Sequence, residues 1–312
     1  MKKILVQDSS DTFDHLKWNH DFKIASQKKE GFRELRSEIF KGTLSIVKSG
    51  NYKLNKETVK INNTTIKSEF FQAPESLQPK EMFKTEFSIL NEDCLEVALY
   101  LLKLGLNPCV LNMANRQNPG GGVLGGAGAQ EENLFRRSNL FLSLYQYASY
   151  ADQYGLKQSN FQYPLDRNTG GVYSSGITVF RGSEKNGYCL LKDPYMMSFV
   201  AVPGISNPPL VKKSGIYYLS EEMVEPTKLK IRTILRIARK YEHDSLVLGA
   251  LGCGAFCNPP NHIAKIFKEV FEEQEFVNQY KQVIFAIFDD HNSAKEHNPD
   301  GNYLPFKKVF GG

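Results

Sequence analysis

One run of thirteen residues constrains this chain more than any other feature. It begins at Gly120 and ends at Glu132, and it holds six glycines followed by Gln130 and two adjacent glutamates. Glycine lets backbone N–H groups approach an anion closely, because no side chain stands in the way. Carboxylates are candidate acid or base groups. The run therefore favours a loop that holds phosphate and presents a glutamate beside a phosphorylated sugar.

Length and composition narrow the class of protein. A chain of 312 residues forms one large domain or two small ones, and its 41% apolar and 23% charged residues are ordinary for a globular protein. The net charge of +5 attracts an anionic ligand but is too small to indicate direct nucleic-acid binding. Because no run of about 18 apolar residues occurs, we expect no transmembrane helix and no membrane partner.

The number of cysteines and the N-terminal residues indicate the cellular compartment. Five cysteines, an odd number at scattered positions, argue against a disulfide framework. The short apolar stretch Ile4–Val6 is ended by Asp8 before it reaches the length of a signal-peptide core. We therefore expect a cytoplasmic protein, or a nuclear one if the source is eukaryotic.

The layout along the chain changes near residue 85. Residues 1–84 are expected to form a mostly helical extension packed on the core, with one helix near 30–47 and a polar stretch over 49–67. Over residues 85–312, strand-like and helix-like segments alternate, which indicates an α/β sheet covered on both faces. Strands are expected at 86–90, 109–113, 172–180, 198–202, 245–251 and 283–288. Four helices are expected between and after them. The first has its N-cap at Asn91, the second spans 134–145, the third is started by Pro226, and the fourth is opened by Asn258-Pro259-Pro260.

Other interpretations of the glycine run are weaker. A flexible connection would not normally run from a buried strand into an amphipathic helix. Gly120, Gly122 and Gly125 satisfy the dinucleotide pattern G-x-G-x-x-G, but Gln146 and Tyr147 occupy the place where an acidic residue is expected. A Walker-type phosphate loop is excluded because no Gly-Lys-Ser/Thr follows.

A second glycine turn, Gly252-Cys253-Gly254, follows the strand expected at 245–251. Ligands of α/β sheets bind at the carboxyl ends of strands, so both glycine segments are placed to reach that edge. The turn is either a backbone cradle for phosphate or simple tight-turn geometry between a strand and a helix.

At these residues a family resemblance becomes specific. A triple glycine followed after seven residues by Gln130-Glu131-Glu132 is similar to the signature of poly(ADP-ribose) glycohydrolases, and Asn118-Pro119 with Phe135-Arg136-Arg137 resembles the microbial branch. The segment Leu248–Phe256 is similar to the second phosphate loop of macrodomains. The resemblance covers most of the chain from about residue 85 onward, and more loosely the N-terminal part. It implies a three-layer α/β/α macrodomain-like fold with a mixed central sheet.

The resemblance also implies different roles for the two glutamates. Glu132 would carry the acid/base chemistry, and Glu131 would orient a ribose through its hydroxyls. Neighbouring residues point about 100° apart on a helix, so they do not form the facing pair usual in glycosidases. The competing interpretation is a solvated helix start, in which Glu132 pairs with Arg136 four residues on. A helix N-terminus favours the ionised carboxylate, so an acid role requires Glu132 to be poorly solvated once ligand is bound.

Further residues are assigned to substrate through the resemblance. At least one of Asn112, Asn115 and Asn118 would contact the terminal ribose, although asparagine is also common in loops. Phe256 would pack on the ribose and favour chain ends, although an aromatic there is more often core, and Ala255 is smaller than expected beside it. The remaining substrate-binding candidates are Gly120, Gly121, Gly122, Val123, Gln130, Gly252, Cys253 and Gly254.

No cofactor or metal is expected. Cys253 and Cys257 are four residues apart but lack a second ligand pair, which argues against zinc. Asp289–Asn292 either contacts the ligand at the sheet edge or caps the last strand, and the cap is favoured.

The function predicted from these residues is glutamate-catalysed hydrolysis of ribose–ribose bonds in poly(ADP-ribose), mainly from chain ends. The expected partners are ADP-ribose and poly(ADP-ribose) chains on modified proteins. Two alternatives stay open, a mono-ADP-ribosyl hydrolase acting on protein or nucleic acid and a reader that binds ADP-ribose without cleaving it. The intact Gln130-Glu131-Glu132 argues against a reader, because readers do not need it.

Overall fold

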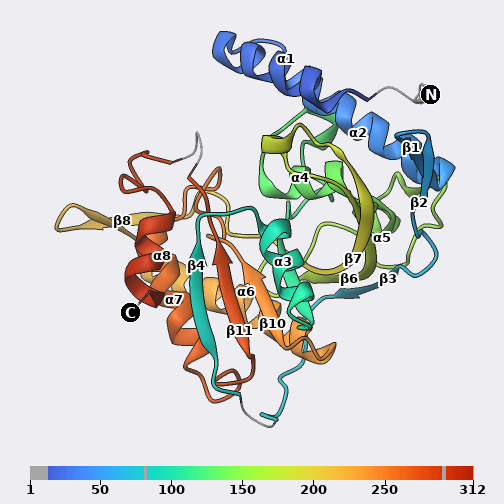
Figure 1. Ribbon diagram of the computed structural model, residues 1–312. Helices are drawn as coiled ribbons and strands as arrows, with labels where there is room; N and C mark the ends of the chain where they lie inside the picture. Colours follow the sequence, from blue (N-terminus) through green and yellow to red (C-terminus); the bar gives the residue numbers. More distant parts are fainter. Residues whose placement is uncertain (1–12, 81–82, 290–292, 312) are drawn as a thin grey trace. The chain divides into compact units, whose positions relative to one another are not determined.

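The computed structural model describes residues 13–80, 83–289 and 293–311 (Figure 1). Its contacts group into two compact units, and the chain passes between them several times. Unit 1 takes residues up to 68 together with 117–164 and 174–197, and unit 2 takes 69–116, 165–173 and 198–312. Each unit therefore joins segments that are far apart in the sequence. The boundary expected between an extension at 1–84 and a catalytic domain at 85–312 stays a prediction.

A seven-stranded mixed sheet confirms the α/β pattern predicted from the sequence. Its strands are Lys67–Phe71 (β3), Glu86–Leu90 (β4), Pro108–Met113 (β5), Gly171–Arg181 (β6), Leu190–Val202 (β7), Ser245–Leu248 (β10) and Gln282–Ala286 (β11). Their order in the sheet is β3-β6-β7-β5-β10-β11-β4. In unit 2, β5 pairs in parallel with β7 and β10, and β11 pairs in parallel with β10 and β4. Because parallel strands end at one edge, β5 and β10 deliver the residues that follow them to that edge.

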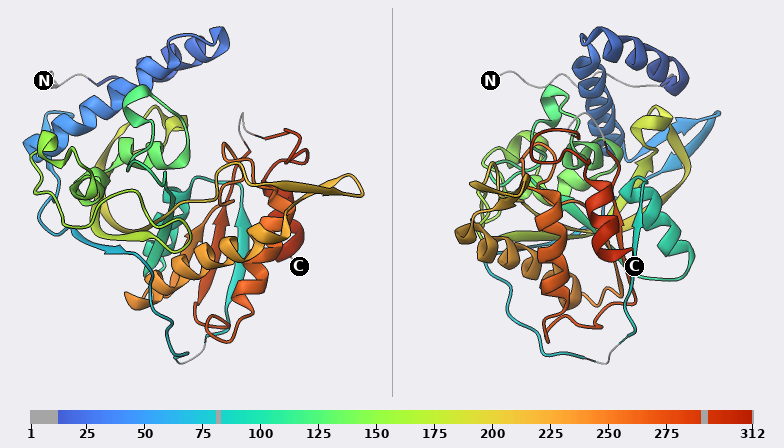
Figure 2. Two further views of the ribbon diagram at one scale, coloured as in Figure 1. Left: turned by 180° about the vertical axis from the view of Figure 1, so that it is seen from behind. Right: turned by 90° about the vertical axis from the view of Figure 1, so that its left-hand side faces the viewer.

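Helices cover both faces of the sheet in unit 2. In Figure 1, α3 (Cys94–Lys103) lies in front of the strands, whereas α6 (Glu221–Lys240) and α7 (Pro260–Phe271) lie in front when the molecule is seen from behind in Figure 2. A last helix, α8 (Tyr303–Phe310), packs on α7 and β4. This is the three-layer α/β/α arrangement expected from the sequence.

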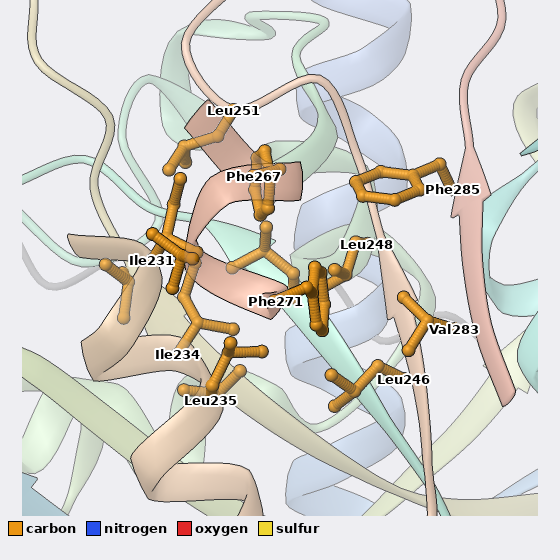
Figure 3. Close-up of a cluster of buried hydrophobic side chains, with 14 of the residues drawn as sticks. Ile231, Ile234, Leu235, Leu246, Leu248, Leu251, Phe267, Phe271, Val283 and Phe285 are labelled. Carbon is orange, nitrogen blue, oxygen red and sulfur yellow. The ribbon is translucent and has the colours of Figure 1, made fainter. Parts of the chain in front are cut away.

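Alternate strand residues build the core of unit 2 under α6 and α7. Leu246 and Leu248 of β10 and Phe285 of β11 are buried in one cluster with Ile231 of α6 and Phe267 of α7 (Figure 3). Each side chain of this size contributes about 1.5–3 kcal/mol on burial. The cluster continues to Leu251 and Cys253, so the second glycine turn is attached to the rigid core.

Two helix starts in unit 2 differ from the expectation. The cap of α3 is Asp93, whose carboxylate accepts from the N–H groups of Leu95 at 2.9 Å and Glu96 at 3.2 Å, so the assignment to Asn91 was wrong. Helix α6 begins at Glu221, and Pro226 lies inside it rather than at its start. A proline there removes one intrahelical donor, and the many buried residues of α6 outweigh that loss.

Unit 1 contains more structure near the N-terminus than the sequence indicated. Two helices, α1 (His15–Lys28) and α2 (Phe32–Ser49), are followed by a hairpin of β1 (Asn51–Leu54) and β2 (Glu57–Lys60). The predicted helix at 30–47 corresponds to α2, whose buried face includes Phe40 and Leu44. Helix α1 and the hairpin were not predicted, and a second hairpin, β8 (Leu210–Lys213) with β9 (Ile216–Leu219), was also missed in unit 2.

The single helix expected over 134–145 is wrong, because it is two helices in unit 1. Helix α4 (Gln130–Arg137) ends at Arg137, and α5 (Leu140–Leu144) begins three residues later. Ser138 is extended, with φ −148° and ψ 172°, and it forms an antiparallel bridge with Val179. Tertiary pairing therefore overrides the helical periodicity here. Among the described residues, no helix is long and apolar enough to cross a membrane.

Candidate active site

The first glycine run, in unit 1, is a series of hydrogen-bonded turns. The N–H of Gly121 donates to the Asn118 carbonyl at 3.1 Å, and the N–H of Val123 donates to the Gly120 carbonyl at 3.0 Å. The Gly122 carbonyl then accepts from the N–H of Ala127 at 3.1 Å. The run is therefore an ordered loop that leads directly into α4, which begins at Gln130.

Glu132 is buried, and only one of its two carboxylate oxygens has a hydrogen-bond partner among the described residues. Its side chain is 7% exposed, and its Oε1 accepts from the N–H of Gly122 at 2.9 Å. Its Oε2 is buried and has no hydrogen-bond partner within the described part of the chain. An unsatisfied buried polar group costs about 1–3 kcal/mol, so such an atom in a native fold calls for a functional reason. A ligand hydroxyl, a water or a glycosidic oxygen would satisfy it.

The solvated helix start considered above is wrong. Glu131 is 2% exposed, and the poor solvation that an acid role requires of Glu132 is already present. Arg136 does not pair with Glu132, because its Nη1 donates to the Ala127 carbonyl at 2.7 Å and its Nε donates to the Tyr188 hydroxyl at 2.8 Å. The two glutamates are thus buried acidic groups at the start of a short helix.

Only glycine fits at position 121. Its φ is +50°, and a Cβ built there would lie 2.5 Å from Oε1 of Glu132 and 3.4 Å from Oε2 of Glu131. The backbone of the triple glycine therefore packs directly on both carboxylates. This contact brings together Gly121, Gly122, Glu131 and Glu132 as the sequence predicted.

Tyrosines surround Glu131 in unit 1. Burial, the neighbouring Tyr154 and the charge of Glu131 raise the pKa of Tyr150 to about 12, and burial followed by the charge of Glu131 raises the pKa of Tyr163. The Tyr150 and Tyr145 rings meet edge to face at 5.4 Å. These phenols stay protonated at neutral pH, so they remain hydrogen-bond donors beside the carboxylate. Sequence reasoning missed them because they lie between 13 and 31 residues beyond Glu132, the last residue of the motif.

The second glycine turn, in unit 2, presents free backbone donors. In the part of the chain that the structure describes, the N–H groups of Gly254, Ala255 and Phe256 donate to no protein acceptor. Consecutive free N–H groups in a turn form an anion-binding concavity. The turn is tight as well, since Gly252 has φ +73° and a Cβ on Gly204 would lie 2.9 Å from the Gly252 Cα.

Carbonyl groups of this turn are held by side chains from other segments of unit 2. Asn258 donates from Nδ2 to the carbonyls of Ile205 at 2.6 Å, Gly252 at 3.0 Å and Phe256 at 3.2 Å. His297 Nε2 lies 2.9 Å from the Cys253 carbonyl, which makes this nitrogen the donor. Because the carbonyls are bound from within the protein, the turn is fixed with its N–H groups available.

The remaining candidates occupy different settings. In unit 2, Asn112 is buried in β5 and Asn115 is half-buried after it, while Phe256 is half-buried rather than core. In unit 1, Asn118 is exposed, Val123 is buried in a short 3-10 turn and Gln130 is the first residue of α4. Burial raises the pKa of the Cys253 thiol, which fits a small buried residue in a tight turn.

The favoured cap at Asp289–Asn292 is only partly visible, because residues 290–292 lie outside the described residues. Asp289 itself accepts from the N–H of Asn302 at 2.6 Å and from the Ser293 hydroxyl at 2.9 Å. It therefore organises the segment that also carries His297.

Asn258 is a residue whose role the sequence did not reveal, since it was interpreted only as a helix opener. We expect Asn258→Ala to lower the affinity for ADP-ribose by about tenfold, because one carbonyl left unsatisfied costs about 1–3 kcal/mol and the turn loosens. Calorimetric titration with ADP-ribose measures the effect. Asn207→Ala, which alters an exposed side chain beside the same turn, serves as the control, and equal affinities for both variants would contradict the assignment.

Comparisons with known proteins fit this geometry. A model of the microbial-type PARG catalytic domain matches residues 41–182, a range that includes the first glycine run and both glutamates. The crystal structure of poly(ADP-ribose) glycohydrolase (PARG) from Thermomonospora curvata is 27% identical, with a TM-score of 0.68 over 88% of this chain and 99% of that one. Over residues 41–182 the chain is similar to the microbial-type PARG catalytic domain.

Two further solved structures are similar to this chain. The Thermomonospora curvata enzyme bound to the inhibitor ADP-HPD is 26% identical, with a TM-score of 0.64 over 88% of this chain and 98% of that one. The Deinococcus radiodurans enzyme in complex with ADP-ribose is 28% identical, with a TM-score of 0.54 over 73% of this chain and 84% of that one. A search of curated proteins found no match.

Proposed function

We propose that this protein hydrolyses the ribose–ribose O-glycosidic bonds of poly(ADP-ribose) and releases ADP-ribose. The observation that carries the proposal is Glu132, a buried carboxylate whose Oε1 accepts from the Gly122 N–H and whose Oε2 has no hydrogen-bond partner among the described residues. Similarity to the microbial-type PARG catalytic domain supports the substrate, because similar proteins were solved with ADP-ribose or ADP-HPD bound.

In the proposed reaction, Glu132 serves first as acid and then as base. Its protonated Oε2 gives a proton to the oxygen of the leaving ribose while the bond from that oxygen to the anomeric carbon breaks. The Glu132 carboxylate then takes a proton from the attacking water, whose oxygen bonds to the same carbon. This acid/base assistance accounts for about 10²–10⁴-fold of the rate, and the remainder comes from positioning and electrostatics.

Roles for the other residues follow from the chemistry of the two loops. Glu131 would hold the ribose hydroxyls next to the reacting carbon, with Tyr150 nearby as a further donor. The free N–H groups of Gly254, Ala255 and Phe256 suit a diphosphate, whose negative charge would also stabilise positive charge developing on the sugar. The Phe256 ring would pack on the ribose and favour chain ends.

The biological substrate is proposed to be poly(ADP-ribose) attached to modified proteins, and the location the cytoplasm. The proposed substrate rests on the residues above and on the similarity to the microbial-type PARG catalytic domain. The proposed location rests on the scattered cysteines and on the short apolar stretch near the N-terminus. Among the described residues, no helix could span a membrane.

A release assay with two substrates tests the proposal. Purified protein is incubated with labelled poly(ADP-ribose) and, separately, with a protein that carries one ADP-ribose. Free ADP-ribose from the polymer is the expected product. Release from the singly modified protein alone would reassign the activity to a mono-ADP-ribosyl hydrolase, and tight ADP-ribose binding without release from either would indicate a reader.

A further inference from the structure

Helix α2 supports the first glycine run in unit 1. The Ser37 hydroxyl of α2 donates to the Leu124 carbonyl at 2.8 Å. A Cβ on Gly126 would lie 1.8 Å from the Arg33 carbonyl oxygen, and a Cβ on Gly128 would lie 2.3 Å from Nη1 of Arg36. The glycines of the run thus serve two purposes. Gly121 makes room for the carboxylates, whereas Gly126 and Gly128 make room for α2.

Arg136 joins this support to the loop through a buried chain of polar contacts. Its Nη1 donates to the Ala127 carbonyl at 2.7 Å, and its Nε donates to the Tyr188 hydroxyl at 2.8 Å. That hydroxyl donates in turn to Oε2 of Glu184 at 2.9 Å. Arg36 of α2 closes the chain with two bonds of 2.7 Å from Nε and Nη2 to the Glu184 carboxylate. We name Arg36, Glu184, Tyr188 and Arg136 the α2 clamp.

The clamp is built from groups that are costly to bury. Arg136 and Tyr188 are fully buried, and Nη2 of Arg136 has no hydrogen-bond partner within the described residues. Burial opposes ionisation of Glu184, but the hydrogen bonds and charge of Arg36 outweigh it and lower the pKa of Glu184, so the clamp is charged at neutral pH. Apolar side chains of the same size would hold the fold at less cost, so the polar chain calls for a reason beyond packing.

The loop end of the clamp is linked to Glu132 through hydrogen bonds of Ala127 and Gly122. Arg136 fixes the Ala127 carbonyl, and the N–H of Ala127 itself donates to the Gly122 carbonyl at 3.1 Å. The N–H of Gly122 is the donor to Oε1 of Glu132. A shift of the Ala127 peptide therefore moves the group that orients Glu132.

From these contacts we infer that Arg136 is a positioning residue, which holds the Ala127 peptide so that Gly122 keeps Glu132 aimed at the substrate. The inference rests on the proposed function only for the identity of the reaction. It also means that α2 and the 184–188 turn contribute to the geometry of the site.

Tyr188→Phe tests the inference, because it removes the hydroxyl between Arg136 and Glu184 while leaving the ring in place. Tyr52→Phe is the matched control, since it also removes a buried hydroxyl of unit 1, one that bonds to the Leu191 carbonyl rather than to the clamp. We expect Tyr188→Phe to lower kcat by about 10–100-fold with KM little changed, because small displacements of catalytic groups have effects of this size. Its kcat–pH profile should also differ from that of the wild type, whereas the profile of Tyr52→Phe should not.

A second readout does not depend on activity. Amide hydrogen exchange across 120–128 should accelerate in Tyr188→Phe and stay unchanged in Tyr52→Phe, at a temperature where both variants remain folded. Unchanged exchange, or faster exchange with wild-type kcat and pH profile, would overturn the inference. If the wild type itself released no ADP-ribose, the proposed function would fail, and the exchange measurement alone would decide whether the clamp holds the loop. Arg136→Lys keeps the charge but not the planar fork, and it should reproduce the Tyr188→Phe result.

Discussion

Glu132→Gln is expected to abolish release of ADP-ribose from the polymer, with a fall of about 10²–10⁴-fold in kcat. The amide keeps the size of the side chain and can still accept at Oε1 from the Gly122 N–H, but it can neither give nor take the catalytic proton. The measurement is the initial rate of ADP-ribose release from labelled poly(ADP-ribose), wild type beside variant.

The affinity for ADP-ribose shows whether the variant has lost only the catalytic step or also the ability to bind the ligand. Calorimetric titration with ADP-ribose should give Glu132→Gln an affinity close to that of the wild type, since the amide keeps the size of the side chain and can still accept from the Gly122 N–H. Glu221→Gln, in the exposed first turn of α6, is the matched control and should leave the rate unchanged. Full activity in Glu132→Gln would remove the acid/base assignment, and loss of both rate and affinity would make Glu132 a binding residue.

Hydrophobic periodicity in the sequence was sufficient to place those helices and strands whose apolar residues form a regular stripe or run. Strands β4 and β5 and helix α7 lie where their apolar residues predicted, because each packs a regular stripe or run into the core of unit 2. The hairpins β1–β2 and β8–β9 were missed because four-residue strands with mostly exposed or half-buried residues carry little periodic signal. The break at Ser138 depends on its bridge to Val179, which is invisible to a local pattern.

Some residues of the candidate site could likewise be predicted from the sequence, and others could not. The glutamates and both glycine segments could be found because their residues are adjacent in the sequence and form a motif. The α2 clamp could not, since Arg36 and Glu184 are 148 positions apart and Arg136 lies 52 positions before Tyr188. Arg136 was visible only as a possible partner of Glu132 on the same helix, and the structure directs its guanidinium elsewhere.

Gly121→Ala is expected to abolish activity without unfolding the protein. The residue has φ +50°, which costs an alanine roughly 1–2 kcal/mol. The added Cβ would also lie 2.5 Å from Oε1 of Glu132, so the carboxylate must move by several tenths of an ångström or more. Displacement on this scale lowers kcat by about 10²-fold, and the same movement crowds Glu131. The rate of ADP-ribose release and the thermal unfolding midpoint, measured together, test both parts of the expectation.

Gly155→Ala is a control that measures only the cost of placing an alanine at a positive φ. Gly155 belongs to unit 1 and has φ +72°, but a Cβ there would meet no atom within 4 Å. The two variants should therefore lose similar stability, while only Gly121→Ala loses activity. If Gly155→Ala and Gly121→Ala kept the same rate, the triple glycine would be needed for its turn alone. A selective loss at Gly121 instead means that the glycine is required by the carboxylate it touches, which ties the most conspicuous feature of the sequence to the position of Glu132.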